Sequence, residues 1–150
     1  IMKIKTLSFF FFFFSLVLVS CSSDDSSSSG GGPSATTGFK WKENSTTATE
    51  NTAASSNFQA SSLFAKNGSN ATIFEINLMQ GSAVGTYTFD GDYINGTALT
   101  YVTEDFNATS GTITITEKTA TEISGSFEAH GTGNNGLTVI YGTFTDIPVQ

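Results

Sequence analysis

The stretch TITITEKTATEISGSFEA, from Thr112 to Ala129, predicts a β-hairpin and with it the class of the fold. Apolar and polar residues alternate on both sides of a short break, and alternation with a period of two is typical of strands that bury one face. The break at residues 118–120 is too short for a crossover connection, so the two runs should pair antiparallel. We therefore expect this hairpin as part of an antiparallel sheet.

Similar short runs continue through the chain from residue 38 onward. Threonine, serine, glycine, isoleucine and aromatic residues dominate there, whereas strong helix formers are sparse. Asn-Gly and Asp-Gly pairs, which supply the positive φ of tight reversals, separate several runs. Besides the two hairpin runs, the predicted strands are residues 39–42, 58–65, 74–78, 84–89, 99–103 and 137–144, while the polar residues 46–57 stay unassigned. The sequence predicts an all-β domain: a single antiparallel meander of about eight strands, closed as a small lipocalin-like barrel or folded as a sandwich.

The expected core collects the large apolar side chains that share a strand phase. Its members are Phe39, Trp41, Phe58, Phe64, Phe74, Ile76, Leu78, Tyr87, Phe89, Leu99, Tyr101, Ile113, Ile115, Ile123, Phe127, Val139, Tyr141 and Phe144.

The N-terminal segment has the layout of a lipoprotein signal peptide. Lys3 and Lys5 precede an apolar run that contains six consecutive phenylalanines and ends in Leu-Val-Ser-Cys at residues 18–21, which resembles a bacterial lipobox. As a helix at ~1.5 Å per residue, this run is shorter than the ~30 Å hydrocarbon core of a bilayer. The Cys21 thiol is the nucleophile suited to thioether formation, and the small Ser20 gives a protease access to the bond before it. We expect residues 1–20 to be removed between Ser20 and Cys21 and Cys21 to carry the acyl chains; an ordinary secretory signal is the alternative.

Residues 21–37 are rich in serine and glycine and form the expected flexible tether between the anchor and the β-domain of residues 38–150. Asp24 and Asp25 follow the cysteine closely and resemble the acidic export signal of surface-displayed lipoproteins; two solvated linker charges are the alternative. The expected location is the outer membrane, lipid-anchored, with exposure at the cell surface if the acidic pair is such a signal.

Composition excludes several functions. Because Lys3 and Lys5 lie in the leader, four lysines remain against thirteen acids, which gives residues 21–150 a formal charge of −9, and the chain has no arginine. Such a domain repels phosphate backbones, so nucleic acid is not an expected partner. Cys21 is the only cysteine, so no internal disulfide can form and motifs with two or more cysteine ligands are excluded.

Several strand and turn fragments also form a recognisable set. They are FKWKEN at 39–44, GTY at 85–87, GTITI at 111–115, ISGSF at 123–127 and GTF at 142–144. Together with the lipobox, this set resembles a family of small all-β lipoproteins of unknown function from Gram-negative bacteria. The resemblance covers the chain from about residue 39 to its end, and it implies the fold and the envelope address but no catalytic or binding residue.

Candidate catalytic groups are weakly marked. His130, the only histidine, alternates with Phe127 and Ala129 and should face solvent, and no Gly-x-Ser-x-Gly elbow accompanies it. Carboxylates for glycoside hydrolysis would have to come from Glu75, Glu104, Asp105, Glu117, Glu122 and Glu128, and no spacing singles out two of them.

Two further candidates concern binding. Asp90, Asp92 and Asn95 place oxygen ligands in one loop as a weak calcium candidate, although the closing glutamate of an EF-hand is missing and tight turns explain the same residues. Trp41 and Tyr93 are the aromatic candidates for ligand contact; Trp41 shares a strand phase with Phe39, which favours the core, and Tyr93 should be exposed.

The sequence therefore predicts a non-enzymatic binding or accessory module without a cofactor. Its expected partners are the membrane, through Cys21, and a glycan, a small ligand or an envelope protein. The alternatives are a lipocalin-like carrier of a small apolar ligand and a glycan hydrolase that uses surface carboxylates.

Overall fold

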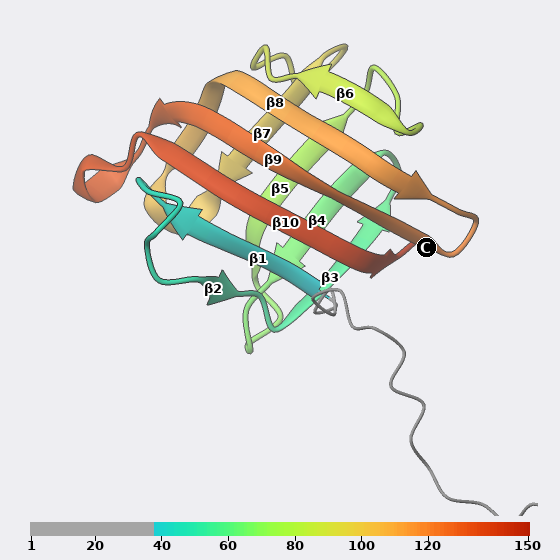
Figure 1. Cartoon of the computed structure of the whole chain (residues 1–150), viewed down its shortest axis with the longest axis horizontal. Coiled ribbons are helices and arrows are strands. Elements are labelled where there is room, and N and C mark those ends of the chain that lie inside the picture. The colour runs from blue at the N-terminus through green and yellow to red at the C-terminus, as the bar shows by residue number, and fades with distance from the viewer. Residues whose placement is uncertain (1–37) are drawn as a thin grey trace, which may run out of the picture. The chain divides into compact units, whose positions relative to one another are not determined.

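The computed structural model describes residues 38–150, which form an all-β domain as the sequence predicts (Figure 1). The strands are β1 (Gly38–Glu43), β2 (Asn51–Thr52), β3 (Ser55–Gln59), β4 (Ser62–Lys66), β5 (Thr72–Leu78), β6 (Gly85–Thr88), β7 (Thr97–Tyr101), β8 (Phe106–Lys118), β9 (Glu122–Thr132) and β10 (Val139–Pro148). Two single-turn 3₁₀ helices, η1 (Val102–Glu104) and η2 (Asn134–Gly136), lie between strands. No helix in these residues is long and apolar enough to cross a membrane.

The strands form one antiparallel sheet in the order β2-β1-β10-β9-β8-β7-β5-β4-β3, with β6 paired to β8 beside this path. From β3 onward most chain neighbours are sheet neighbours, which is the predicted meander, and β1 joins it by pairing with β10. The sheet curls into a half-barrel (Figure 1). The chain end meets β3 where Phe58 bridges Val149 and accepts a hydrogen bond from the Gln150 amide at 2.9 Å.

The predicted hairpin is confirmed. β8 and β9 pair antiparallel with Ile113 opposite Phe127, and the Thr119 amide donates to the Glu122 carbonyl at 2.9 Å across the turn. Both strands extend beyond the alternating run, and β8 has 13 residues. Because of this length, β8 pairs with β7 near its start and with β6 farther along.

The prediction of one strand over residues 58–65 is wrong. Ala60 and Ser61 have φ values of +48° and +67°, so the chain reverses there and forms the hairpin β3–β4. No glycine or asparagine marks this turn, which is why the run looked continuous. This extra strand and the two-residue β2 raise the number of strands from the expected eight to ten.

An aromatic cluster fills the middle of the core. The Phe74 ring stacks on Tyr101 with centroids 4.2 Å apart and lies 5.1 Å from Phe39 and 5.0 Å from Trp41. Four members of the expected core are only half-buried: Phe64, Tyr87, Val139 and Tyr141. Buried positions that the sequence pattern did not place there include Leu63, Ala65, Phe106, Leu137, Ile140 and Ile147.

Strand phase explains these corrections. The β3–β4 reversal turns Leu63 and Ala65 inward, so that Phe64 faces outward. In β10 the inward phase is that of Ile140 and Phe144, which leaves Val139 and Tyr141 on the outer face. Tyr87 packs against the core while it stays half-buried.

Candidate functional site

The pairing of β1 with β10 arranges outward side chains in rows. Lys40 lies opposite Thr143, and Lys42 lies opposite Tyr141. Trp41, between the two lysines, is buried, and because side chains alternate along a strand the lysines face outward.

A depression of about 220 Å³ lies over these two strands. Its side-chain walls come from Lys40, Lys42, Tyr141 and Thr143 together with Thr46 and Glu50 of the segment that follows β1. Trp41, Phe127 and Gly142 also line it, although their strand phase is inward.

The depression concentrates positive charge in an acidic domain. Residues 38–150 contain four lysines, of which two, Lys40 and Lys42, line it. Lys40 Nζ lies 3.1 Å from Glu50 Oε1, whereas Lys42 Nζ donates to the Thr46 carbonyl at 3.1 Å. Lys42 takes part in neither of the ion pairs within residues 38–150, so its charge is not neutralised. A polar ligand with a carboxylate could pair with Lys42 while a sugar ring lies on the face of Tyr141.

Trp41 belongs to the inside of the barrel. It is 6% exposed, its ring meets Phe74 edge-on, and its Nε1 donates to Glu43 Oε1 at 3.1 Å. Trp41 and Phe127 both line the depression from the inward phase, and Tyr141 is the outward-facing aromatic residue among those that line it. Tyr141 could be placed on the outer face from the sequence alone, because it precedes Gly142, and Gly142 shares the inward phase of Phe144.

Tyr93 is elsewhere on the domain. It is 39% exposed, its hydroxyl lies 2.7 Å from Thr100 Oγ1, and it donates to Asn107 Oδ1 at 2.9 Å. These contacts fix the ring over β7 and β8, away from the depression on β1 and β10. The structure therefore does not bring the two aromatic candidates of the sequence together.

The calcium candidate is organised by backbone hydrogen bonds. Asp90 Oδ1 accepts from the amides of Asp92 and Thr97, each at 3.0 Å, and Asp92 Oδ1 accepts from the amides of Ile94 and Asn95 at 2.8 and 3.0 Å. Hydrogen bonds from the Asn95 and Ile94 amides lower the pKa of Asp92 below 3.8. One oxygen of each carboxylate, Asp90 Oδ1 and Asp92 Oδ1, is therefore engaged in holding the turn. Within residues 38–150 no group of three or more acidic, histidine or cysteine side chains could hold a metal ion.

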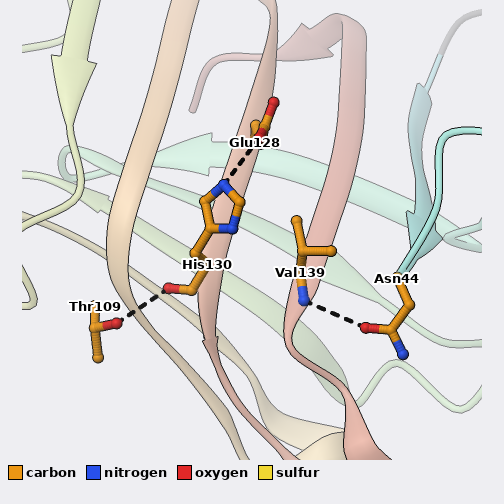
Figure 2. A network of polar contacts seen from close by, with 5 residues as sticks. All are labelled: Asn44, Thr109, Glu128, His130 and Val139. Carbon is orange, nitrogen blue, oxygen red and sulfur yellow. Dashed lines mark hydrogen bonds and ion pairs between the residues drawn. The ribbon is translucent and has the colours of Figure 1, made fainter.

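His130 is exposed on β9, as the strand phase predicted. Figure 2 shows its ring directed along the strand toward Glu128, whose Oε1 lies 2.8 Å from Nε2, while its carbonyl accepts from Thr109 Oγ1 at 3.3 Å. On the neighbouring strand the Val139 amide donates to Asn44 Oδ1 at 3.4 Å (Figure 2). The partner of His130 is therefore a carboxylate of its own strand, and no serine hydroxyl in the described residues bonds to the ring.

Comparisons with protein-family models, with curated proteins and with solved structures found no match to the chain. The geometry of the domain therefore carries the functional conclusion. Ser20, Cys21 and residues 21–37 lie outside the described residues.

Proposed function

We propose that the domain is a non-enzymatic binding module and that a glycan occupies the depression over β1 and β10. The observation that carries this proposal is the outward placement of Lys42 and Tyr141 as cross-strand neighbours in the wall of the depression. An aromatic face with adjacent donors and hydroxyls matches the alternating apolar and polar surfaces of a sugar ring.

The packing of the barrel interior supports this reading over a carrier of an apolar ligand. Phe39, Trp41, Phe74, Tyr101 and Phe127 occupy the inside, with ring centroids 4.2 to 6.4 Å apart. A lipocalin-like carrier would need that space for its ligand.

We further propose that the protein is a lipoprotein of the bacterial outer membrane, held by acyl chains on Cys21, and a member of the small all-β lipoproteins that its motifs resemble. The lipobox, the single cysteine and the Ser/Gly-rich tether support this proposal. Metabolic labelling with palmitate and cell fractionation test it: the wild-type chain should be labelled and membrane-bound, and Cys21→Ala should be neither. Unchanged membrane retention of Cys21→Ala would overturn the anchor without affecting the glycan site.

The glycan proposal is tested with the full chain in detergent micelles, first on a glycan array and then by titration of the best ligand. Tyr141→Ala should weaken binding at least about tenfold, because the stacking face is lost. Tyr93→Ala is the matched control and should bind like the wild type, since Tyr93 lies over β7 and β8. Absence of glycan binding, or equal binding by wild type and Tyr141→Ala, would refute the proposal.

A further inference from the structure

The two rows that begin at the lysines continue across the outer face of the sheet. Lys40, Thr143, Ser126, Thr114 and Thr86 are successive register partners on β1, β10, β9, β8 and β6. After the lysine, every side chain of this row ends in a hydroxyl group. The hydroxyls of Thr86 and Thr114 lie 3.0 Å apart, so these two neighbours are in hydrogen-bond contact.

A second row of outward side chains runs beside the first and begins at Lys42. It continues through Tyr141, Glu128, Thr112 and Thr88 on the same four following strands. Its aromatic member is next to the lysine, and hydroxyls return on β8 and β6. The outer face therefore changes from basic and aromatic at β1 and β10 to hydroxyl-rich at β8 and β6.

A second depression, of about 390 Å³, lies on the other side of the hydroxyl row. Two members of the row, Thr143 and Ser126, line this second depression, and Thr143 lines both depressions. Its far walls include the carboxylates of Glu117 and Asp146. Asp146 is fixed in place, because its amide donates to Ser124 Oγ at 2.9 Å.

The two depressions share Thr143 and together define a path over β1, β10, β9 and β8, with Lys40 and Lys42 at its β1 end, Glu117 at its β8 end and Asp146 on β10. Paired strands lie ~4.8 Å apart, so the path from β1 to β8 covers three spacings, or roughly 14 Å. That length exceeds a single sugar ring. Hydroxyl side chains both donate and accept hydrogen bonds, which suits the hydroxyl groups of a chain of sugars that crosses the strands.

We infer that the ligand is a short linear oligosaccharide that carries its only acidic sugar at the Lys42 end and neutral sugars toward Glu117 and Asp146. This inference rests on the proposed glycan-binding function and extends it to ligand length and charge. The unneutralised Lys42 pairs with the single carboxylate. Glu117, Asp146 and Glu128 repel further carboxylates along the path, so a uniformly acidic polysaccharide is disfavoured.

The test uses the full chain in detergent micelles and defined sugars. The probes are two trisaccharides with one terminal hexuronic acid and two neutral hexoses, with the acid at either end, the neutral trisaccharide, the tri-uronic acid and the single hexuronic acid. We expect one of the terminally acidic trisaccharides to bind at least about tenfold more tightly than each other probe. Tighter or equal binding of the tri-uronic acid or of the single uronic acid would overturn the inference.

Two variants locate the ends of the ligand. Lys42→Met should remove the preference for the acidic trisaccharide, so that the acidic and neutral trisaccharides bind this variant with similar affinity. Ser126→Ala should weaken the trisaccharide several-fold and leave the single uronic acid unaffected. Circular dichroism and thermal unfolding confirm that both variants are folded.

The results separate this inference from the proposal beneath it. If single sugars bind at Tyr141 and extension of the chain adds no affinity, the extended ligand is wrong and the glycan site stands. If no sugar binds, both are wrong.

Discussion

The ring of Phe127 lies across Gly142, its partner on the neighbouring strand β10. A Cβ atom on Gly142 would collide with carbon atoms of this ring. In the next inward pair of the same two strands the roles are exchanged: a Cβ on Gly125 of β9 would meet the ring of Phe144 on β10. Each strand thus supplies one ring to cover a glycine of the other, which packs the inner face of this strand pair closely.

Gly142→Ala should therefore destabilise the domain by about 1 to 3 kcal/mol, because the added methyl group must displace the Phe127 ring or the backbone. Urea unfolding followed by the fluorescence of Trp41, the only tryptophan, measures the change. Gly68→Ala is the matched control, since no atom lies within 4 Å of its added Cβ and it should cost much less. Equal stability of Gly142→Ala and wild type would show that the ring moves aside freely.

A second relationship crosses the barrel and predicts an alkaline limit to stability. The Tyr101 hydroxyl of β7 donates to Glu43 Oε1 of β1 at 3.1 Å, although the two strands are not neighbours in the sheet. Burial, and then the negative charge of Glu43, raise the pKa of Tyr101 from 10.0 to about 12. The unfolded chain releases this proton at lower pH than the folded one, so the free energy of unfolding should fall as pH rises from 10.0 to about 12.

Urea unfolding at several pH values between 8 and 12 tests this prediction. Tyr101→Phe should lack the part of the decline that Tyr101 causes, and Tyr93→Phe, a change at an exposed tyrosine, should keep it. If wild type and Tyr101→Phe lose stability in parallel above pH 10, ionisation of Tyr101 does not cause the decline.

The alternation around Thr112–Ala129 was sufficient to predict the class of the fold, because a period of two permits only half-buried strands and a short break permits only a hairpin. The β3–β4 reversal could not be predicted in the same way. Ala60 and Ser61 adopt positive φ without glycine or asparagine, so only the surrounding pairing, with Phe58 opposite Leu63, specifies the turn. A reversal that tertiary contacts impose leaves no local signal.

The candidate site was predictable only in part. The strand phase that Trp41 shares with Phe39 correctly predicts that Trp41 is buried. The depression, however, depends on which residues of β10 lie opposite β1, and the sequence of one strand does not determine its register with a strand that is distant in the chain. Tyr141 was assigned to the core because its own run is apolar on both phases. The structure resolves this ambiguity through Gly142 and Phe144.

Strand phase also predicts that two phenylalanines differ in how much stability is lost when each is replaced by alanine. Phe74→Ala should cost about 3 to 5 kcal/mol, because Phe74 is fully buried and contacts four other rings of the core. Phe64→Ala, at a half-buried outward position, should cost only about 1 kcal/mol. Urea unfolding of both variants measures the two costs, and similar losses would contradict the assignment of Phe64 to the outer face.

The carboxylates in the turn at residues 90–97 should stabilise it by accepting hydrogen bonds from backbone amides and not by binding an ion. Asp90 accepts from the Asp92 and Thr97 amides and, through Oδ2, from Gln80 Nε2 at 3.1 Å. Asp90→Ala leaves these donors without their acceptor and should lower the free energy of unfolding by about 1 to 3 kcal/mol, whereas Asp90→Asn keeps an acceptor oxygen and should cost less.

Thermal unfolding of wild type, Asp90→Ala and Asp90→Asn with and without millimolar calcium separates the two roles. If the carboxylates act only as acceptors of backbone hydrogen bonds, the wild type should have the same transition temperature in calcium and in a chelator. Both variants should then unfold at a lower temperature in either condition. A wild-type transition that rises with calcium concentration, and fails to rise in Asp90→Ala, would mean that the ion competes successfully with the amides for the Asp90 oxygens, because a ligand that binds only the folded state must stabilise it.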